Sequence, residues 1–243
     1  GLAGVTLALA LLAIATAPGY GANGNAGVVV LEVADAIGPA TSDYLRRGIE
    51  SAAERDAALV IIVLDTPGGL DSSMRDIIKA ILASPVPVAT FVYPSGSRAA
   101  SAGTYILYAS HIAAMAPATN LGAATPVPIG GGPGGEKGKP DGDADGDAEP
   151  DPGSAQKRKA VNDAIAYIRS LAELRDRNAD WAESAVSKGE SLSAEAALEL
   201  GVIDVISNDI PGLLRAIDGR TVTTEFGKVT LATDGLVVER QLP

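Results

Sequence analysis

The chain has 243 residues, a formal net charge of −11, one histidine and no cysteine. The acidity argues against nucleic acid as a partner, because a phosphate backbone selects basic surfaces. Without cysteine there is no thiol nucleophile, disulfide or thiolate metal site, and one histidine excludes a multi-histidine metal centre. We therefore expect chemistry that rests on Ser, Thr, Lys, Asp, Glu and the backbone, with no cofactor and no metal.

The N-terminal segment is distinct from the rest of the sequence. Residues 2–17 are almost uninterrupted Ala, Leu, Val and Ile. This length is slightly short for a membrane-spanning helix, which needs roughly 20 residues, and it suits the core of a signal peptide. We expect residues 1–22 to be a signal peptide or an N-terminal membrane anchor, with a buried core helix as the alternative.

From residue 27 onward, apolar strand-like runs alternate with helical periodicities. The expected strands are 28–33, 59–64, 87–93 and 112–115, and the expected helices are 41–55, 72–82 and 99–109. The run 59–64 is continuous Val, Ile and Leu, which is typical of a strand buried on both faces of a parallel sheet. The alternation predicts an α/β fold with a mostly parallel sheet covered by helices.

Residues 122–156 interrupt this rhythm with many glycines and prolines and an acidic run. Such a segment buries too little apolar surface to offset its ordering entropy, so we predict a mobile surface loop. Asp141, Asp143 and Asp145 have the spacing of an EF-hand start. Calcium is not expected there, because Pro152 occupies the position that needs a bidentate Glu.

The remaining residues predict three more helices and a β-rich tail. The expected helices are 157–177, 193–200 and 210–217; the expected strands are 202–206 and two within 221–238 that turn at Asp234 and Gly235.

Two short stretches carry the candidate chemistry. The turn at Gly68 and Gly69 follows strand 59–64, and sites of parallel sheets collect at such strand ends. Ser101 lies among small residues in the expected first turn of a helix, where unpaired N–H groups favour an oxyanion. If Ser101 attacks a carbonyl, the N–H groups of Gly69 and Ala102 are the candidate oxyanion hole. Tight packing of a helix on a sheet explains the small residues equally well.

A nucleophilic serine also needs a base. His111 follows Ser101 by ten residues, about 15 Å along a helix, so we expect a surface histidine at a strand start rather than a triad member. A lysine serves as base only when it is neutral, which requires burial or neighbouring positive charge. Lys157 and Lys159, which flank Arg158, meet the second condition, although a solvated basic face is the ordinary interpretation of such a cluster.

These motifs resemble a known family. Residues 65–69 (DTPGG), 99–106 (AASAGTYI) and 116–123 (APATNLGA) are similar to the membrane-bound serine proteases of the NfeD family, which belong to the ClpP class. Residues 166–172 and 192–204 extend the similarity, which covers roughly 28–214.

The resemblance implies a ClpP/crotonase-like α/β fold and a Ser-Lys dyad in a protease domain over residues 23–220. Ser101 matches the nucleophile and Lys159 the general base, while Gly69 and Ala102 match the oxyanion positions. The acidic insertion lies just ahead of Lys159, so Lys157 remains an alternative base. Residues 221–243 are then a short β tail leading towards a membrane region that the chain does not include.

The family's activity implies a serine endopeptidase that cleaves hydrophobic segments of stomatin-like membrane proteins through an acyl-enzyme. We expect a homodimer that is membrane-associated through its missing C-terminal region, with the protease domain extracytoplasmic. Met74, Ile77 and Ile78 are expected to line the peptide groove. The alternatives are a non-proteolytic scaffold for a stomatin-like partner and a crotonase-like acyl-CoA enzyme, although no basic pocket for CoA phosphates is evident.

Overall fold

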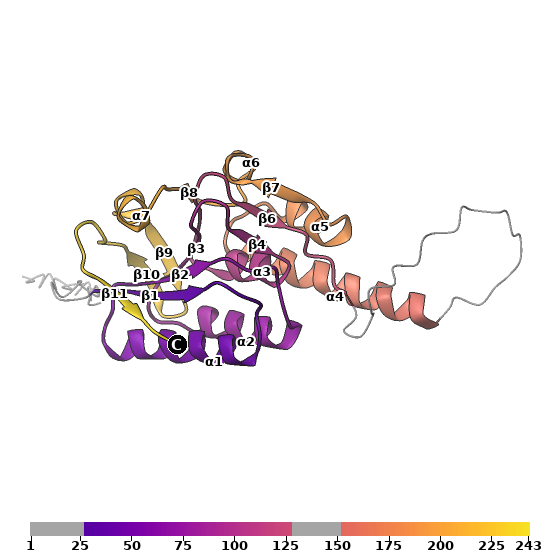
Figure 1. The fold of residues 1–243 in the computed structure, drawn as a ribbon, viewed down its shortest axis with the longest axis horizontal. Helices are drawn as coiled ribbons and strands as arrows, with labels where there is room; N and C mark the ends of the chain where they lie inside the picture. Colours follow the sequence, from indigo (N-terminus) through magenta and orange to yellow (C-terminus); the bar gives the residue numbers. More distant parts are fainter. Residues whose placement is uncertain (1–26, 128–151) are drawn as a thin grey trace, which may run out of the picture.

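The computed structural model describes residues 27–127 and 152–243 (Figure 1). The expected leader, the Asp141–Asp145 spacing and most of the expected mobile loop lie outside the described residues.

A sheet of parallel strands forms the centre of the molecule. Its order is β11-β1-β2-β3-β5-β8. The strands are β1 Val28–Val33, β2 Leu59–Leu64, β3 Val88–Val92, β5 Ile112–Met115, β8 Val205–Ile206 and β11 Val238–Gln241. The predicted α/β class with a mostly parallel sheet is confirmed. The tail contributes β11, which pairs with β1 at the edge of the sheet.

Helices cover both faces of this sheet, since its strands alternate between two hydrophobic layers. In β1, Leu31 faces the layer that contains α1 and α2, and Val30 faces the layer that contains α7. Figure 1 shows α1 and α2 below the sheet and α7 above it. The helices are α1 Pro39–Glu54, α2 Asp71–Leu82, α3 Ala102–Ala109, α4 Pro152–Leu174, α5 Ala179–Ser187, α6 Ala194–Glu199 and α7 Ile210–Ile217.

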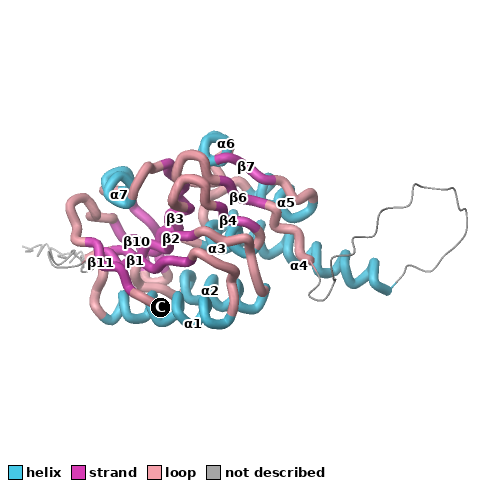
Figure 2. Tube along the Cα trace, in the orientation of Figure 1, coloured by secondary structure: helices cyan, strands magenta, loops and turns pink. Residues whose placement is uncertain are grey.

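A smaller sheet lies beside α3 (Figure 2). Its strands are β4 Arg98–Ala100, β6 Asn120–Gly122 and β7 Ser191–Ser193, in the order β4-β6-β7. The predicted helix 99–109 is therefore wrong at its start, because residues 98–100 pair as a strand and the helix begins at Ala102. Ser101 therefore lies between the strand and the helix, not inside a helical turn.

Two further expectations need correction. Within the segment predicted as loop 122–156, helix α4 begins at Pro152. Proline is tolerated there because the N–H groups of a first helical turn have no partner within the helix. The tail hairpin consists of β9 Thr221–Thr224 and β10 Gly227–Thr230 and turns at Glu225 and Phe226, not at Asp234. The Thr224 hydroxyl accepts a hydrogen bond from the Phe226 N–H and so fixes that turn.

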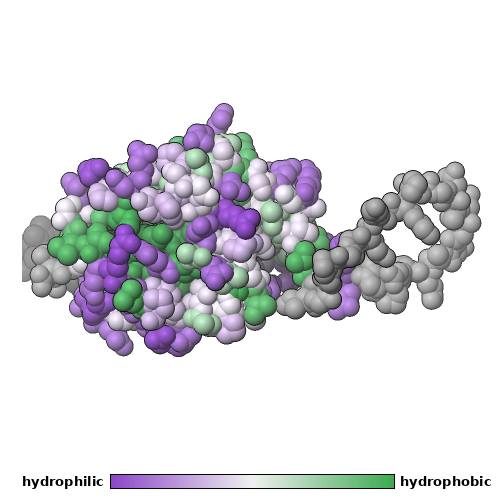
Figure 3. All heavy atoms as spheres, viewed as in Figure 1, coloured by the Kyte–Doolittle hydropathy of each residue, from purple (hydrophilic) through white to green (hydrophobic). Residues whose placement is uncertain are grey.

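The surface in Figure 3 is mainly hydrophilic, with hydrophobic side chains gathered at the left of the view, where β11 lies. Val237, which precedes β11, is 78% exposed. None of the described helices combines the length and the apolar character needed to cross a bilayer.

Candidate active site

Ser101 occupies a strained turn between β4 and α3. Its backbone has φ 50° and ψ −114°, a left-handed conformation that residues other than glycine rarely adopt. Such a backbone costs about 1–3 kcal/mol and persists only where surrounding contacts impose it. Here the Ser101 N–H donates to the Gly122 carbonyl at 2.9 Å, and the Ser101 carbonyl accepts from Thr104 N–H at 2.9 Å. The turn holds the half-buried side chain clear of its own helix.

The two predicted motifs meet at this turn. A Cβ built on Gly68 would lie 2.7 Å from Ser101 Cβ and 3.2 Å from its Oγ, and Gly68 has φ +117°. The strand ends are joined as well, since Thr66 N–H donates to the Arg98 carbonyl and Ala100 N–H to the Thr66 carbonyl. A glycine at position 68 therefore lets the turn after β2 pack directly on Ser101.

The predicted oxyanion groups are available for a ligand. Across residues 27–127 and 152–243, neither the Gly69 N–H nor the Ala102 N–H has a hydrogen-bond acceptor. Ala102 is the first residue of α3, so its N–H also lies at the positive end of the helix dipole. The chain thus carries two unpaired amides, one on each side of the contact between Gly68 and Ser101.

Thr104 braces this arrangement, a role that the sequence did not reveal. Its buried hydroxyl lies 2.9 Å from the Ala99 carbonyl and 3.0 Å from the Gly122 carbonyl, and it accepts from Gly122 N–H at 3.1 Å. One side chain therefore joins β4, α3 and β6 around Ser101. Its place in the small-residue motif was the only available signal, because the partners come from different elements.

Lys159 is not in contact with Ser101. It lies on the N-terminal part of α4, which projects beyond the body of the molecule in Figure 1. Lys157 and Lys159 are both exposed, and within the described part of the chain neither forms a hydrogen bond or an ion pair. The structure thus brings Gly69, Ala102 and Ser101 together and leaves the candidate bases apart.

His111 is buried, so the expectation of a surface histidine is wrong. Only 6% of the residue is exposed, and it lies beside Arg175, just after α4, and Val222 of β9. Its Nδ1 accepts a hydrogen bond from Val88 N–H at 3.1 Å, which places the proton of the neutral ring on Nε2. Burial, with Arg175 and Arg177 nearby, lowers the pKa of His111 to about 3.

This burial predicts a loss of stability in acid. The folded-state pKa lies below the ordinary 6.5, so the stability contributed by neutral His111 is complete above about pH 6.5 and falls as the pH drops towards about 3. The expected slope is about 1.4 kcal/mol per pH unit. Urea unfolding of wild type and His111→Gln at about pH 7, 5.5 and 4.5 measures it. Equal slopes for the two proteins would contradict the prediction.

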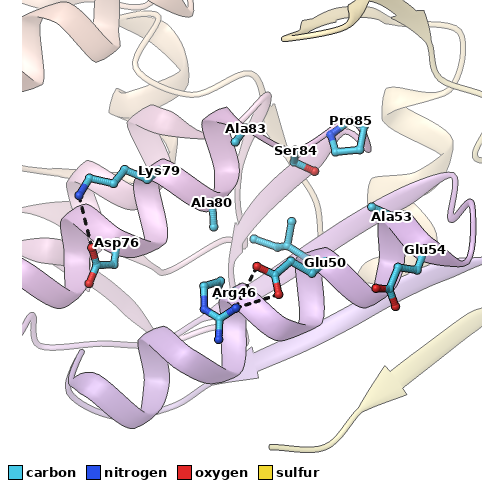
Figure 4. A pocket seen from close by; sticks show the side chains of 11 residues that line it. Arg46, Glu50, Ala53, Glu54, Asp76, Lys79, Ala80, Ala83, Ser84 and Pro85 are labelled. Atoms are coloured by element: carbon cyan, nitrogen blue, oxygen red, sulfur yellow. Dashed lines mark hydrogen bonds and ion pairs between the residues drawn. The ribbon is translucent and has the colours of Figure 1, made fainter.

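The expected groove residues Met74, Ile77 and Ile78 do not line a groove. They are 3%, 0% and 0% exposed, because the apolar stripe of α2 faces the sheet. A separate hollow of about 540 Å³ lies between α1 and α2. Figure 4 shows its charged rim, where Arg46 pairs with Glu50 and Lys79 with Asp76. The hollow is not lined by Ser101, Gly69 or Ala102 and is separate from the candidate site.

The parallel sheet, the strained serine and the adjoining glycine turn define a ClpP-like α/β protein. A family model for the NfeD1b N-terminal domain matches residues 27–142. The chain is 38% identical over 211 residues to the membrane-bound protease PH1510 of Pyrococcus horikoshii, covering 83% of this chain. It spans 44% of the length of that relative.

Solved structures agree with this similarity. One is a lysine-to-alanine mutant of the 1510-N membrane-bound stomatin-specific protease in complex with a substrate peptide, with a TM-score of 0.78, 36% identity and coverage of 91% of this chain and 94% of that chain. Another is a serine-to-alanine mutant of the same protease, with a TM-score of 0.76, 36% identity and coverage of 90% and 99%. The chain belongs to the NfeD family of ClpP-like proteins, in its NfeD1b N-terminal domain.

Proposed function

We propose that this chain is a serine endopeptidase domain in which Ser101 is the nucleophile and Lys159 the general base. The observation that carries the proposal is the strained Ser101, packed on Gly68 between the unpaired amides of Gly69 and Ala102. Strain of this kind is retained where it orients a reacting group. Relatives that are proteases, with solved mutants at a serine and at a lysine, support the same assignment.

The proposed reaction is acyl transfer. Neutral Lys159 Nζ takes the hydroxyl proton as Ser101 Oγ attacks the peptide carbonyl carbon, and the N–H groups of Gly69 and Ala102 stabilise the resulting oxyanion. The C–N bond breaks, Lys159 returns the proton to the leaving amine, and an ester remains on Ser101. Water, deprotonated by Lys159, then hydrolyses the ester. Because Lys159 is exposed on the projecting part of α4, it has to approach Ser101 before the first step.

The proposed substrate is a hydrophobic segment of a stomatin-like membrane protein, since a relative is a stomatin-specific protease seen with a substrate peptide. We also propose a homodimer and an extracytoplasmic protease domain, which extends beyond the expected end at residue 220 because β11 pairs with β1 in the central sheet. We propose that residues 1–22 act as a leader or anchor. The separation of Lys159 from Ser101 favours one second candidate, a scaffold that binds the same partner without cleaving it.

The test is cleavage of a hydrophobic peptide from the C-terminal segment of a stomatin-like protein, followed by mass spectrometry. We expect cut products from this peptide and none from a control peptide of equal length in which alternate apolar residues are replaced by Lys and Glu. Tight binding of the first peptide without cut products would favour the scaffold. Absence of both binding and cleavage would contradict the proposed substrate.

A further inference from the structure

The guanidinium of Arg75 joins α2, the helix that follows the glycine turn, to α4, the helix that carries Lys159. Arg75, on α2, donates from Nε to Asp71 at 2.9 Å and from its Nη2 to Asp163 of α4 at 2.6 Å. The same guanidinium lies over the Tyr167 ring of α4, with 4.4 Å between Cζ and the ring centroid. Asp71 and Arg75 are one turn apart on α2, whereas Asp163 and Tyr167 belong to another helix. We name this group, Asp71, Arg75, Asp163 and Tyr167, the Arg75 clamp.

In the sequence, the residues of the Arg75 clamp lie close to the glycine turn and to Lys159. Asp71 is the second residue after Gly69, and Asp163 is the fourth after Lys159. Residues four apart in a helix lie on one face, so Lys159, Asp163 and Tyr167 share the face of α4 that Arg75 contacts. Lys157 lies two residues from Lys159 and therefore on a different face.

The packing of α3 on α4 shows how Ser101 and Lys159 are placed along these two helices. Tyr105 of α3 stacks on Tyr167 of α4 with ring centroids 6.1 Å apart, and Arg175, just after α4, donates to the Ala109 carbonyl at the end of α3. Both helices therefore run in the same direction. Ser101 precedes Tyr105 by one turn and Lys159 precedes Tyr167 by two turns, so the two candidate catalytic residues lie towards the same end of this helix pair.

The contact is only partly shielded from water, since the Asp71 and Asp163 side chains are each 69% exposed. Burial, with a smaller contribution from the Asp71 carboxylate, raises the pKa of Tyr105 well above its ordinary value. The Arg75 side chain is 32% exposed, and residues 156–160 of α4 are all exposed.

We propose that Arg75 is a positioning residue that anchors α4 to α2 at Asp163, one turn after Lys159, and so directs the approach of Lys159 to Ser101. This inference rests on the proposed Ser-Lys chemistry and adds a residue outside the dyad and the oxyanion hole. A planar guanidinium is suited to the task, because it binds two carboxylates and a ring face at fixed angles. Without it, α4 loses this polar tie to α2, and the approach of Lys159 to Ser101 is less well directed.

The test compares wild type, Arg75→Met and Arg75→Lys. The matched control is Arg46→Met, which removes an arginine whose ion pairs with Asp43 and Glu50 stay within α1. The rate of amide hydrogen exchange in residues 156–167 measures how firmly this part of α4 is held, and it can be measured whether or not the protein is active. The rate at which a fluorophosphonate labels Ser101, measured from about pH 6 to 10, reports the position of the base.

We expect faster exchange in residues 156–167 of Arg75→Met and labelling slowed about ten- to hundredfold near pH 7. Its pH profile should rise at higher pH than that of wild type, because a lysine base left in water is neutral only at high pH. Arg75→Lys should recover part of both effects, and Arg46→Met should match wild type.

Unchanged exchange in Arg75→Met would overturn the clamp, whatever the activity. Faster exchange with an unshifted pH profile would overturn the positioning role, because a merely structural contact lowers the rate equally at every pH. If wild type is not labelled at any pH, the proposed function fails, and the positioning role fails with it. The exchange result then shows by itself whether Arg75 joins the helices.

Discussion

Replacing Ser101 by alanine is expected to abolish fluorophosphonate labelling and peptide cleavage while the protein stays folded. The Ser101 hydroxyl makes no hydrogen bond to the described residues, and alanine keeps the Cβ that packs on Gly68. Its loss therefore removes the nucleophile without removing a structural contact. The free energy of unfolding should change by less than about 0.5 kcal/mol, as for substitutions that remove no contact.

Lys159→Ala is expected to lower the labelling rate about 10²- to 10⁴-fold, the usual contribution of a general base. Lys159 is exposed and unpaired within the described residues, so its stability should also be unchanged. Lys157→Ala is the matched control, with equal exposure two residues away. We expect it to label at the wild-type rate, because its side chain lies on another face of α4.

The labelling rates decide which residues are the nucleophile and the base, and urea unfolding of each variant shows whether it is still folded. Loss of labelling in Lys157→Ala together with normal labelling in Lys159→Ala would transfer the role of base to Lys157. Normal labelling in both lysine variants would refute a lysine base. Cleavage by Ser101→Ala at the wild-type rate would remove Ser101 from the mechanism altogether.

Gly68→Ala is expected to have the second large effect, a loss of about a hundredfold in labelling rate. A methyl group at this position would lie 2.7 Å from Ser101 Cβ, closer than two carbon atoms approach without displacement. Ser101 or the turn that carries the Gly69 N–H must then move, and a displacement of about 1 Å costs roughly a hundredfold in rate. The positive φ of residue 68 adds about 1–3 kcal/mol of backbone strain.

Gly96→Ala distinguishes the effect of the contact with Ser101 from the effect of backbone strain. Gly96 has φ +93°, but a Cβ there would meet no atom within 4 Å. Both variants should lose stability in urea unfolding, Gly68→Ala the more because it adds the clash, and only Gly68→Ala should lose labelling. A similar loss of labelling in both would assign the effect to backbone strain. Normal labelling in Gly68→Ala would mean that the contact between the turn and Ser101 is not needed.

The sequence was sufficient to predict the strands of the central sheet except β11, which the tail contributes at the edge. Continuous apolar runs such as 59–64 indicate strands buried on both faces, and helical spacing between them implies parallel connections. The site was predictable in part for a related reason. Gly68 and Ser101 follow strands or begin helices, and in a parallel sheet such positions meet at one edge.

Tertiary structure decided what depends on contacts between distant elements. The left-handed backbone of Ser101 is held by its hydrogen bond to Gly122 of β6, which no local pattern encodes. His111 is buried beside the residues that follow α4 and those of β9, although its position before a strand suggested the surface.

The same distinction applies to α2. The spacing of Met74 and Ile77 predicted an apolar face, and only the packed structure shows that this face meets the sheet rather than a substrate. The link from Arg75 to Asp163 spans 88 positions of sequence. Periodicity is a local property that determines which elements form, whereas the orientation of each side chain depends on the neighbours that folding brings to it.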